Sequence, residues 1–366
     1  MAREIRDFNS ELELRDDRWD FADYNTPTPA PAPTTKPVIE ASPFEEAIRI
    51  AATETPQVTT TLPQVAGLAL HLDGDYLAYY ASGNDETVPG QARQNALDLI
   101  ESFRSRVGAE TVIVHNTSDG STKGERFLAA KVKPYQGHRS SSRKPKNHAY
   151  LRDYLLNYVG AAFTSTNWAD READDAIGLG AMTAIGGTPG YAAIATKDKD
   201  MRMLPGHHIN WTSRDVVIVP PGAFEVIGSD NKLYGLKWFW QQMLEGDSAD
   251  NCPGLEYYVN PKGTLAKLGP KTAEKLLAGT TTSDEAAAIV IDLYKGAYQD
   301  TWAERFVEQA SLLWMRVSPT GEVDDFATHN GHSRINTAFD DEILDAAAAL
   351  KDRVALARQT LNELGN

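Results

Sequence analysis

Cysteine is almost absent from this chain of 366 residues, which has only Cys252. A single thiol excludes an intrachain disulfide and any structural zinc site built on several thiolates. A chain of this length buries a sizeable core without either, in one large or two ordinary domains. The cysteine count therefore suits a reducing compartment.

Long apolar runs are missing as well. The sequence contains no stretch of about 18 apolar residues that could cross a bilayer. The N-terminal Met-Ala-Arg-Glu-Ile-Arg-Asp also lacks the apolar segment of a signal peptide. We therefore expect a cytoplasmic protein with no membrane partner.

Positive charge is scarce, since 36 Lys and Arg stand against 51 Asp and Glu and the net charge is −15. A uniformly acidic surface would repel nucleic acid. The charge is not uniform, however, because residues 126–152 contain eight Lys or Arg and no Asp or Glu. Such a block is often only a solvated or disordered surface, but the interleaved Phe127, Tyr135 and Tyr150 favour contact with a nucleic-acid strand.

The chain divides by composition into a tail and a folded part. Residues 1–62 are predicted to be a disordered tail because they contain a Pro/Thr-rich linker at 25–37. This tail is a flexible tether or a docking segment for a replication-protein partner.

From residue 63 to 232, strand patterns alternate with helical patterns. Strands are predicted at 67–72, 111–115, 161–164, 191–196 and 216–219, and helices at 91–107, 149–159 and 172–185. This alternation predicts an α/β fold with a mostly parallel central sheet covered by helices. Beyond 232 only helices are predicted, at 233–244, 271–277, 283–298, 302–315 and 341–361.

Acidic residues follow the ends of four predicted strands. In chain order they are Asp73; Asp119; Glu172, Asp174 and Asp175; and Asp198 and Asp200. The carboxyl ends of parallel strands line one crevice, so these side chains are expected to converge there. Each acid alone has an ordinary explanation, since Asp and Glu are common in turns and in first helical turns.

Taken together, so many carboxylates would repel each other strongly in a partly desolvated crevice. Divalent cations would relieve that repulsion. Hard oxygen ligands without His or Cys indicate Mg²⁺ or Mn²⁺, and the number of acids indicates two ions. Two such ions clamp the attacking and leaving oxygens of an in-line phosphoryl displacement.

A second region combines acids with a phosphate-binding pattern. Asp247 and Asp250 precede the Gly269-Pro270-Lys271-Thr272 turn, which offers backbone N–H groups to a phosphate where a helix begins. This turn lacks the Gly-Lys-Ser/Thr step of a Walker loop, and the glycines of 178–190 make no dinucleotide fingerprint.

In combination, these motifs resemble the 5′ nuclease, or flap endonuclease, superfamily over residues 68–315. The nearest members are bacteriophage 5′→3′ exonucleases and the 5′-nuclease domain of bacterial DNA polymerase I. The motifs that carry the resemblance are Leu72-Asp73-Gly74, Asp119, Tyr135-Gln136-Gly137-His138-Arg139, Glu172-Ala173-Asp174-Asp175, Thr196-Lys197-Asp198-Lys199-Asp200, Gly246-Asp247-Ser248-Ala249-Asp250-Asn251 and Gly269-Pro270-Lys271-Thr272-Ala273.

The resemblance implies a PIN-like catalytic region at 63–232 with a helical arch at about 122–152. It implies a helix-hairpin-helix region at 233–300, which often binds K⁺ in the family, and C-terminal helices at 301–366. Nine carboxylates would hold the two metals: Asp73, Asp119, Glu172, Asp174, Asp175, Asp198, Asp200, Asp247 and Asp250. DNA would contact Lys131, Lys133, Tyr135, Arg139, Arg143, Lys144, Gly269, Lys271 and Thr272, with Tyr135 stacking on a base.

Three departures from the family pattern bear on function. Gln136 stands where many relatives have a Lys, Tyr80 stands where relatives often have an Arg, and residues 255–267 look like an insertion in the hairpin. Asp75 is an additional acid that we expect to face solvent or support a ligand rather than bind metal.

The resulting prediction is a monomeric, metal-dependent, structure-specific 5′→3′ DNA exonuclease with flap endonuclease activity. It would act on free 5′ ends or 5′ flaps in DNA replication or degradation, in the host cytoplasm if the source is a bacteriophage. The alternatives are a non-catalytic DNA-structure-binding protein of the same fold and a PIN-type ribonuclease. The hairpin pattern argues against a small-molecule phosphatase.

Overall fold

A computed structural model describes residues 64–137, 143–187, 192–260, 262–328 and 339–364. The predicted tail at 1–62 and Arg139 of the predicted arch lie outside the described residues. Within these ranges, no helix combines the length and apolarity needed to cross a bilayer.

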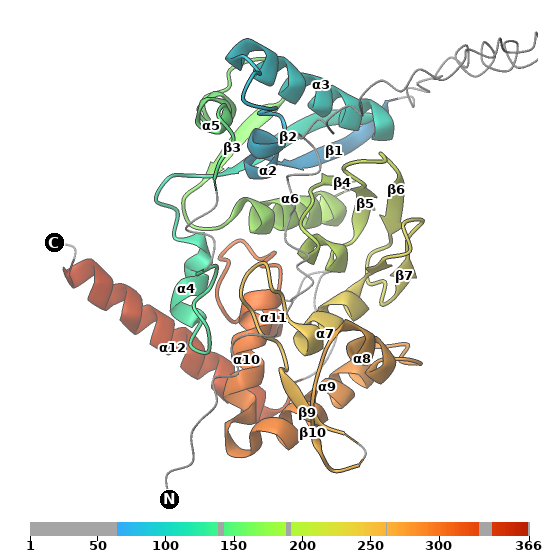
Figure 1. Cartoon of the computed structure of the whole chain (residues 1–366), viewed down its shortest axis with the longest axis vertical. Coiled ribbons are helices and arrows are strands. Elements are labelled where there is room, and N and C mark those ends of the chain that lie inside the picture. The colour runs from blue at the N-terminus through green and yellow to red at the C-terminus, as the bar shows by residue number, and fades with distance from the viewer. Residues whose placement is uncertain (1–63, 138–142, 188–191, 261, 329–338, 365–366) are drawn as a thin grey trace, which may run out of the picture. The chain divides into compact units, whose positions relative to one another are not determined.

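A six-stranded sheet organises residues 64–219 (Figure 1). Its strand order is β3-β2-β1-β4-β5-β6, and every neighbouring pair is parallel except β5 with β6. The strands are β1 (Val65–Asp73), β2 (Ala109–Thr117), β3 (Thr164–Trp168), β4 (Ala192–Ala195), β5 (Gly206–Ile209) and β6 (Val216–Val219). The prediction of a mostly parallel sheet covered by helices is confirmed. Strand β5 was not predicted from the sequence, and β3 begins about three residues later than predicted.

Helices cover the sheet because their apolar residues recur at helical spacing. In α3 (Pro89–Val107) the buried positions are Ala92, Ala96, Ile100, Phe103 and Val107. Pro89 begins this helix, and Gly108 ends it in the left-handed region with φ of 68°. The other helices of this region are α2 (Gly74–Tyr80), α5 (His148–Leu156) and α6 (Ala173–Gly187).

The second half of the chain is mainly helical, as predicted. Its helices are α7 (Leu236–Glu245), α8 (Pro270–Leu276), α9 (Ser283–Tyr298), α10 (Trp302–Leu313), α11 (Asp325–Thr328) and α12 (Asp341–Leu364). Two small antiparallel pairs were not predicted: β7 (Val226–Ile227) with β8 (Leu233–Tyr234), and β9 (Tyr257–Val259) with β10 (Leu265–Lys267). The second pair forms a hairpin within the predicted insertion at 255–267.

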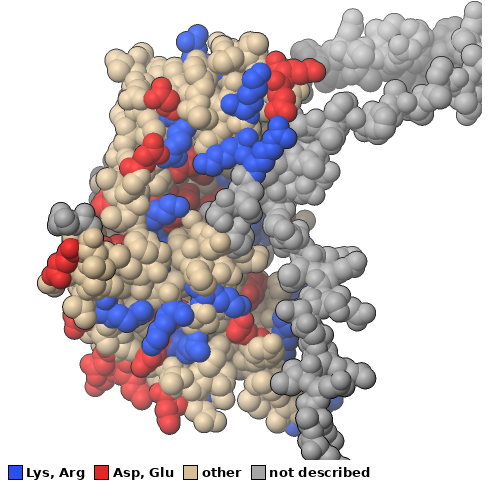
Figure 2. All heavy atoms as spheres, turned by 60° about the vertical axis from the view of Figure 1, so that its left-hand side comes forward, with Lys and Arg blue, Asp and Glu red and all other residues tan. Residues whose placement is uncertain are grey.

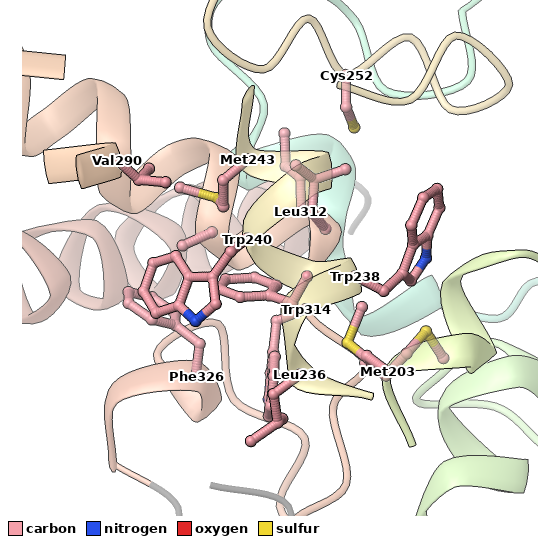
Figure 3. Packing of buried hydrophobic residues seen from close by; sticks show 14 of the residues in the cluster. Met203, Leu236, Trp238, Trp240, Met243, Cys252, Val290, Leu312, Trp314 and Phe326 are labelled. Carbon is pink, nitrogen blue, oxygen red and sulfur yellow. The ribbon is translucent and has the colours of Figure 1, made fainter. Parts of the chain in front are cut away.

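The larger hydrophobic core joins the two halves. It contains residues of α6 and β4 together with those of α7, α9, α10 and α12. Figure 3 shows Trp240, Met243 and Trp314 at the centre of this packing. A smaller core fills the space between the sheet and helices α2, α3 and α5. The loop that follows β4 therefore rests on a packed base.

The predicted arch is helical only at its ends within the described residues. Short helices η2 (Lys123–Glu125) and α4 (Arg126–Ala129) lie at its beginning, and the first turn of α5 lies at its end. Residues 130–137 and 143–147 form turns and irregular backbone. Arginines from the C-terminal region hold its base, since Arg358 of α12 forms an ion pair with Glu125 and Arg353 donates to the carbonyl oxygen of Ala129.

Candidate metal centre

Asp73 lies at the carboxyl end of β1, where the chain turns into α2. Its Oδ1 atom accepts the Tyr76 N–H at 2.8 Å, so it caps α2, and its Oδ2 atom accepts the Thr196 hydroxyl at 3.1 Å. Burial, together with the negative charge of Asp75, raises the pKa of Asp73 to about 7. The strand end thus presents a carboxylate that is costly to ionise without a nearby cation.

Asp174 lies in the first turn of α6. The preceding Ala173 N–H donates to Thr117 Oγ1 at 2.9 Å, which ties the start of α6 to the end of β2. Burial, and then the charges of Asp73 and Asp198, raise the pKa of Asp174 well above its usual value. Its Oδ1 atom is buried and has no hydrogen-bond partner among the described residues. Such an orphaned acceptor is rare in folded proteins and is satisfied by a bound cation or water.

The loop after β4 presents Asp198 and Asp200. Thr196 Oγ1 accepts the Asp198 N–H at 3.0 Å, and Asp198 Oδ1 accepts the Asp200 N–H at 2.8 Å. These two local hydrogen bonds shape the loop. The negative charge of Asp198 raises the pKa of Asp73 and Asp174, whereas Asp200 lies near Asp247 and Asp250. We call Asp73, Asp174 and Asp198 the first carboxylate group.

Asp200, Asp247 and Asp250 form the second carboxylate group. One oxygen from each of these buried side chains lies within 4.8 Å of the others, a spacing that could hold a metal ion. Burial, and then the charges of Asp198 and Asp247, raise the pKa of Asp200 well above its usual value. The Lys199 ammonium lies 3.1 Å from Asp247 Oδ1 and offsets part of this charge.

Glu172 lies beside the second group and is linked to it through Tyr135 and Gln136. The Tyr135 hydroxyl lies 2.8 Å from Glu172 Oε2 and 3.1 Å from Asp250 Oδ2. The Gln136 amide donates to Glu172 Oε1 at 3.1 Å and to Asp250 Oδ1 at 3.0 Å. Burial is the main cause that raises the pKa of Glu172. Tyr135 and Gln136 of the predicted arch therefore lie directly against the carboxylate centre.

Two acids that the sequence assigned to the metals lie elsewhere. Asp175 is buried against the guanidinium of Arg126, with Arg126 Nη2 2.8 Å from Asp175 Oδ1. Burial alone would raise the pKa of Asp175, but Arg126 outweighs it and lowers that pKa. The Asp119 side chain is 91% exposed and pairs with Arg152 at 3.0 Å. Neither acid therefore lies in the two carboxylate groups.

Asp75 is partly exposed and influences the centre through its charge, although it belongs to neither carboxylate group. Its charge acts on both Asp73 and Asp174, and its Oδ1 atom lies 2.9 Å from Arg152 Nη1. Its position two residues after Asp73, in the first turn of α2, was the signal in the sequence. The negative charge of Asp75 thus raises the pKa of Asp73 and Asp174, while Asp75 itself is paired with Arg152.

The residues expected to contact DNA have varied environments. Tyr135 packs against the larger core with its hydroxyl in the acid centre, which differs from the base-stacking position implied by the resemblance.

The basic residues of the segment differ in their pairing. Lys133 pairs with Glu256 at 2.6 Å and Arg143 with Asp85 at 3.2 Å, while Lys131 and Lys144 are exposed. Figure 2 shows Lys and Arg side chains on this side of the molecule with acidic atoms set back between them.

The Gly-Pro-Lys-Thr turn begins α8, as predicted. Gly269 precedes the helix, Pro270 is its first residue, and Gly269 O accepts the Thr272 N–H at 2.9 Å. The Lys271 side chain is exposed. This turn is available at the surface, although the Thr272 N–H already has a partner within the protein.

The donor set fits divalent cations of the hard type. All members of both groups are carboxylates, which are the ligands that Mg²⁺ and Mn²⁺ favour. The orphaned Asp174 oxygen and the raised pKa values of Asp73, Asp174 and Asp200 show a centre short of positive charge. Among the described residues, the second group has the spacing that could hold one ion, and the mutual repulsion of Asp73, Asp174 and Asp198 would be relieved by another.

No protein-family model and no curated protein sequence matches this chain. Solved structures of 5′ nucleases from bacteriophage T5 are similar to it. A T5 protein co-crystallised with metal ions has 15% identity and a TM-score of 0.42, covering 78% of this chain and 98% of its own. A T5 flap endonuclease complex with DNA and metal ions has 16% identity and a TM-score of 0.45, covering 78% and 99%. A mutant T5 5′-exonuclease has 16% identity and a TM-score of 0.40, covering 78% and 98%.

Proposed function

We propose that this protein is a divalent-metal-dependent nuclease that hydrolyses phosphodiester bonds near DNA 5′ ends, as a 5′→3′ exonuclease with flap endonuclease activity. One observation carries the proposal. Two adjoining groups of buried and half-buried carboxylates lie near the carboxyl edge of the sheet, directly against Tyr135 and Gln136 of a strongly basic segment. Acids that share a crevice and lack counter-charge bind metal, and a neighbouring basic segment binds polyanions.

Asp73, Asp174 and Asp198 would hold one Mg²⁺ or Mn²⁺ ion, and Asp200, Asp247 and Asp250 a second. When bound, such ions supply Lewis-acid stabilisation of the charge that develops on the phosphate and its leaving oxygen. The protein itself orients the ligands. Tyr76 and Thr196 fix the Asp73 carboxylate.

Binding of the DNA strand would rest on the basic segment and on α8. The exposed Lys131 and Lys144 lie on the segment, and the exposed Lys271 lies at the start of α8. These side chains neutralise backbone phosphates without reading sequence, so recognition would depend on DNA structure. A K⁺ ion at the hairpin would add to this contact. The protein would act as a monomer in the host cytoplasm, in replication or degradation of DNA.

A substrate panel tests the proposal. The full chain is incubated with Mg²⁺ or Mn²⁺ and labelled 5′-flap, blunt duplex, single-stranded DNA and single-stranded RNA. Cleavage of flap or duplex from the 5′ end supports the proposal, and product length separates mononucleotide release from flap excision. Preferential RNA cleavage would instead indicate a PIN-type ribonuclease. Tight flap binding without cleavage would indicate a DNA-structure-binding protein.

A further inference from the structure

We propose that Lys123 supplies the cation that contacts the phosphodiester at the carboxylate centre, and that Gln136 positions it there. The inference deepens the proposed function and rests on it. The inference rests on a hydrogen-bonded chain that runs from Lys123 through Gln136 to Asp250 of the second carboxylate group and to the neighbouring Glu172.

The chain consists of three short contacts. Lys123 Nζ donates to Gln136 Oε1 at 3.0 Å, and the Gln136 amide nitrogen donates to Glu172 Oε1 at 3.1 Å and Asp250 Oδ1 at 3.0 Å. Gln136 itself is neutral, so the positive charge of this arrangement belongs to Lys123. The ammonium group is therefore placed one amide away from two acids of the centre.

Four other cations near the centre, among the residues that the structure describes, lie in closer ion pairs. Each of them lies at most 3.1 Å from its partner: Arg126 on Asp175, Arg152 on Asp75, Lys133 on Glu256 and Lys199 on Asp247. The carboxylate paired with Lys123 is Glu172, at the longer distance of 3.8 Å. The Lys123 side chain is 46% exposed. Lys123 can thus turn toward an incoming phosphate without breaking a close buried ion pair.

The backbone holds this chain in an uncommon conformation. Lys123, Glu125 and Gln136 all have positive φ, at 51°, 59° and 51°, which non-glycine residues seldom adopt. Local strain of this kind persists where surrounding structure imposes it, and it gathers at functional sites.

The surrounding structure supplies that restraint. Arg316 donates to the carbonyl oxygen of Gly124, and a Cβ atom on Gly124 would lie 2.7 Å from the Arg316 Nη1 atom. Arg358 holds the Glu125 carboxylate in an ion pair. The fold therefore fixes the turn that presents Lys123, which a freely solvated lysine would not need.

The chemistry follows from charge. A phosphodiester approaching carboxylates is repelled unless cations lie on its path, and charge on its oxygens grows as the bond to the leaving oxygen breaks. An ammonium group at this edge offsets that charge. Lys123 would touch the substrate and is a catalytic residue in this sense, whereas Gln136 acts through Lys123 and is a positioning residue.

The test uses full-length protein, a 5′-labelled flap substrate, Mg²⁺ and single-turnover conditions. Lys123→Gln keeps the side-chain stem but removes the charge, and it should slow cleavage by roughly 10²-fold, as for loss of one transition-state donor. Lys123→Arg should retain most of the rate. Adding Gln136→Lys to Lys123→Gln should recover at least about tenfold, because it returns a cation to the same edge.

The matched control is Lys295→Gln. Lys295 of α9 is 42% exposed, close to the 46% of Lys123, and pairs with Asp340 at the same distance of 3.8 Å, away from both carboxylate groups. Its rate should equal that of the unaltered protein. A second readout needs no metal: in EDTA, Lys123→Gln should reduce the slope of log affinity for the flap against log salt by about 0.7 to 0.9, one phosphate contact.

Equal rates for Lys123→Gln and unaltered protein would overturn the inference, as would failure of Gln136→Lys to rescue Lys123→Gln. If the unaltered protein cleaves no substrate, the proposed function fails instead, so the two failures are distinguishable. Should Lys123→Gln fold poorly, the contrast between Lys123→Arg and Lys123→Met, which share a long unbranched stem, tests the same charge.

Discussion

The guanidinium of Arg126 contacts both carboxylate oxygens of Asp175, and its Nη2 atom lies 2.8 Å from Oδ1. Both side chains are buried, and the Arg316 N–H donates to the same Asp175 oxygen at 3.0 Å. This pair anchors the first turn of α6 and removes Asp175 from the carboxylate centre. The adjacent Asp174 has no such partner and faces the other acids.

Replacing Asp174 and Asp175 by Asn should therefore change the stability of the protein in opposite directions. In metal-free protein, Asp175→Asn leaves the buried Arg126 with only the longer 3.4 Å contact to Glu172 as counter-charge, and it should lower the free energy of unfolding by up to about 3 to 5 kcal/mol. Asp174→Asn removes a carboxylate that its neighbours repel and should raise that free energy. Urea unfolding in EDTA measures both. Changes of the same sign in the two variants would contradict the assignment.

The raised pKa of Asp73 predicts a pH dependence. Its carboxyl keeps a proton up to about pH 7 in the folded protein, whereas the unfolded chain releases that proton near the ordinary value of 3.8. The contribution of Asp73 to stability therefore falls as pH rises from about 4 to about 7.

Asp73→Asn cannot titrate, so in EDTA its stability relative to the unaltered protein should increase across that window. The difference between the two proteins cancels the opposite effect of buried His71 and His208. Burial lowers the pKa of each to about 4, and their stability contribution is lost as pH falls below about 6.5. A difference that is constant with pH would refute the raised pKa of Asp73.

Metal binding should stabilise the fold through the second carboxylate group. A ligand at one hundred times its dissociation constant adds about 2.7 kcal/mol to the free energy of unfolding. Thermal melts over a Mn²⁺ titration should show this gain in the unaltered protein and its loss in Asp250→Asn. The exposed Asp119 provides a sharp comparison, because the structure predicts that Asp119→Asn keeps the gain and the family resemblance predicts that it does not.

DNA binding should depend more on the exposed lysines that have no carboxylate partner among the described residues than on Lys133, which has one. Replacing the exposed Lys131 and Lys144 together by Ala should reduce the salt slope of DNA affinity by nearly two charges' worth. Lys133→Ala should have a smaller effect, because Glu256 already neutralises Lys133 at 2.6 Å. Fluorescence anisotropy in EDTA at several salt concentrations measures the slopes. Equal slopes for all three proteins would remove this segment from the DNA interface.

Much of the centre could be predicted because strand ends of a parallel sheet converge. Runs such as Leu68 to Leu72 are apolar enough to be buried strands, and the acids after them then meet at one edge. In the structure, the negative charge of Asp198 raises the pKa of Asp73, Asp174 and Asp200, so these four acids lie near one another. That prediction needed no knowledge of side-chain partners.

The assignment of individual acids within a run did depend on distant partners. Asp175 is withdrawn by Arg126, which is 49 residues away, and Asp119 is turned to solvent beside Arg152. Likewise, the inward position of Tyr135 follows from hydrogen bonding to Asp250, 115 residues away. Local spacing carries no information about such contacts. The β9–β10 hairpin was missed because its strands are only three residues each.

The central claim is that these carboxylates are the catalytic metal site of a 5′ nuclease, and Asp174→Asn tests it most directly. Cleavage of a 5′-labelled flap in Mg²⁺ is measured beside affinity for the same flap in EDTA. Cleavage should be abolished while affinity stays near that of the unaltered protein, because binding rests on the basic segment and α8. Full cleavage by Asp174→Asn, or loss of affinity in step with activity, would contradict it.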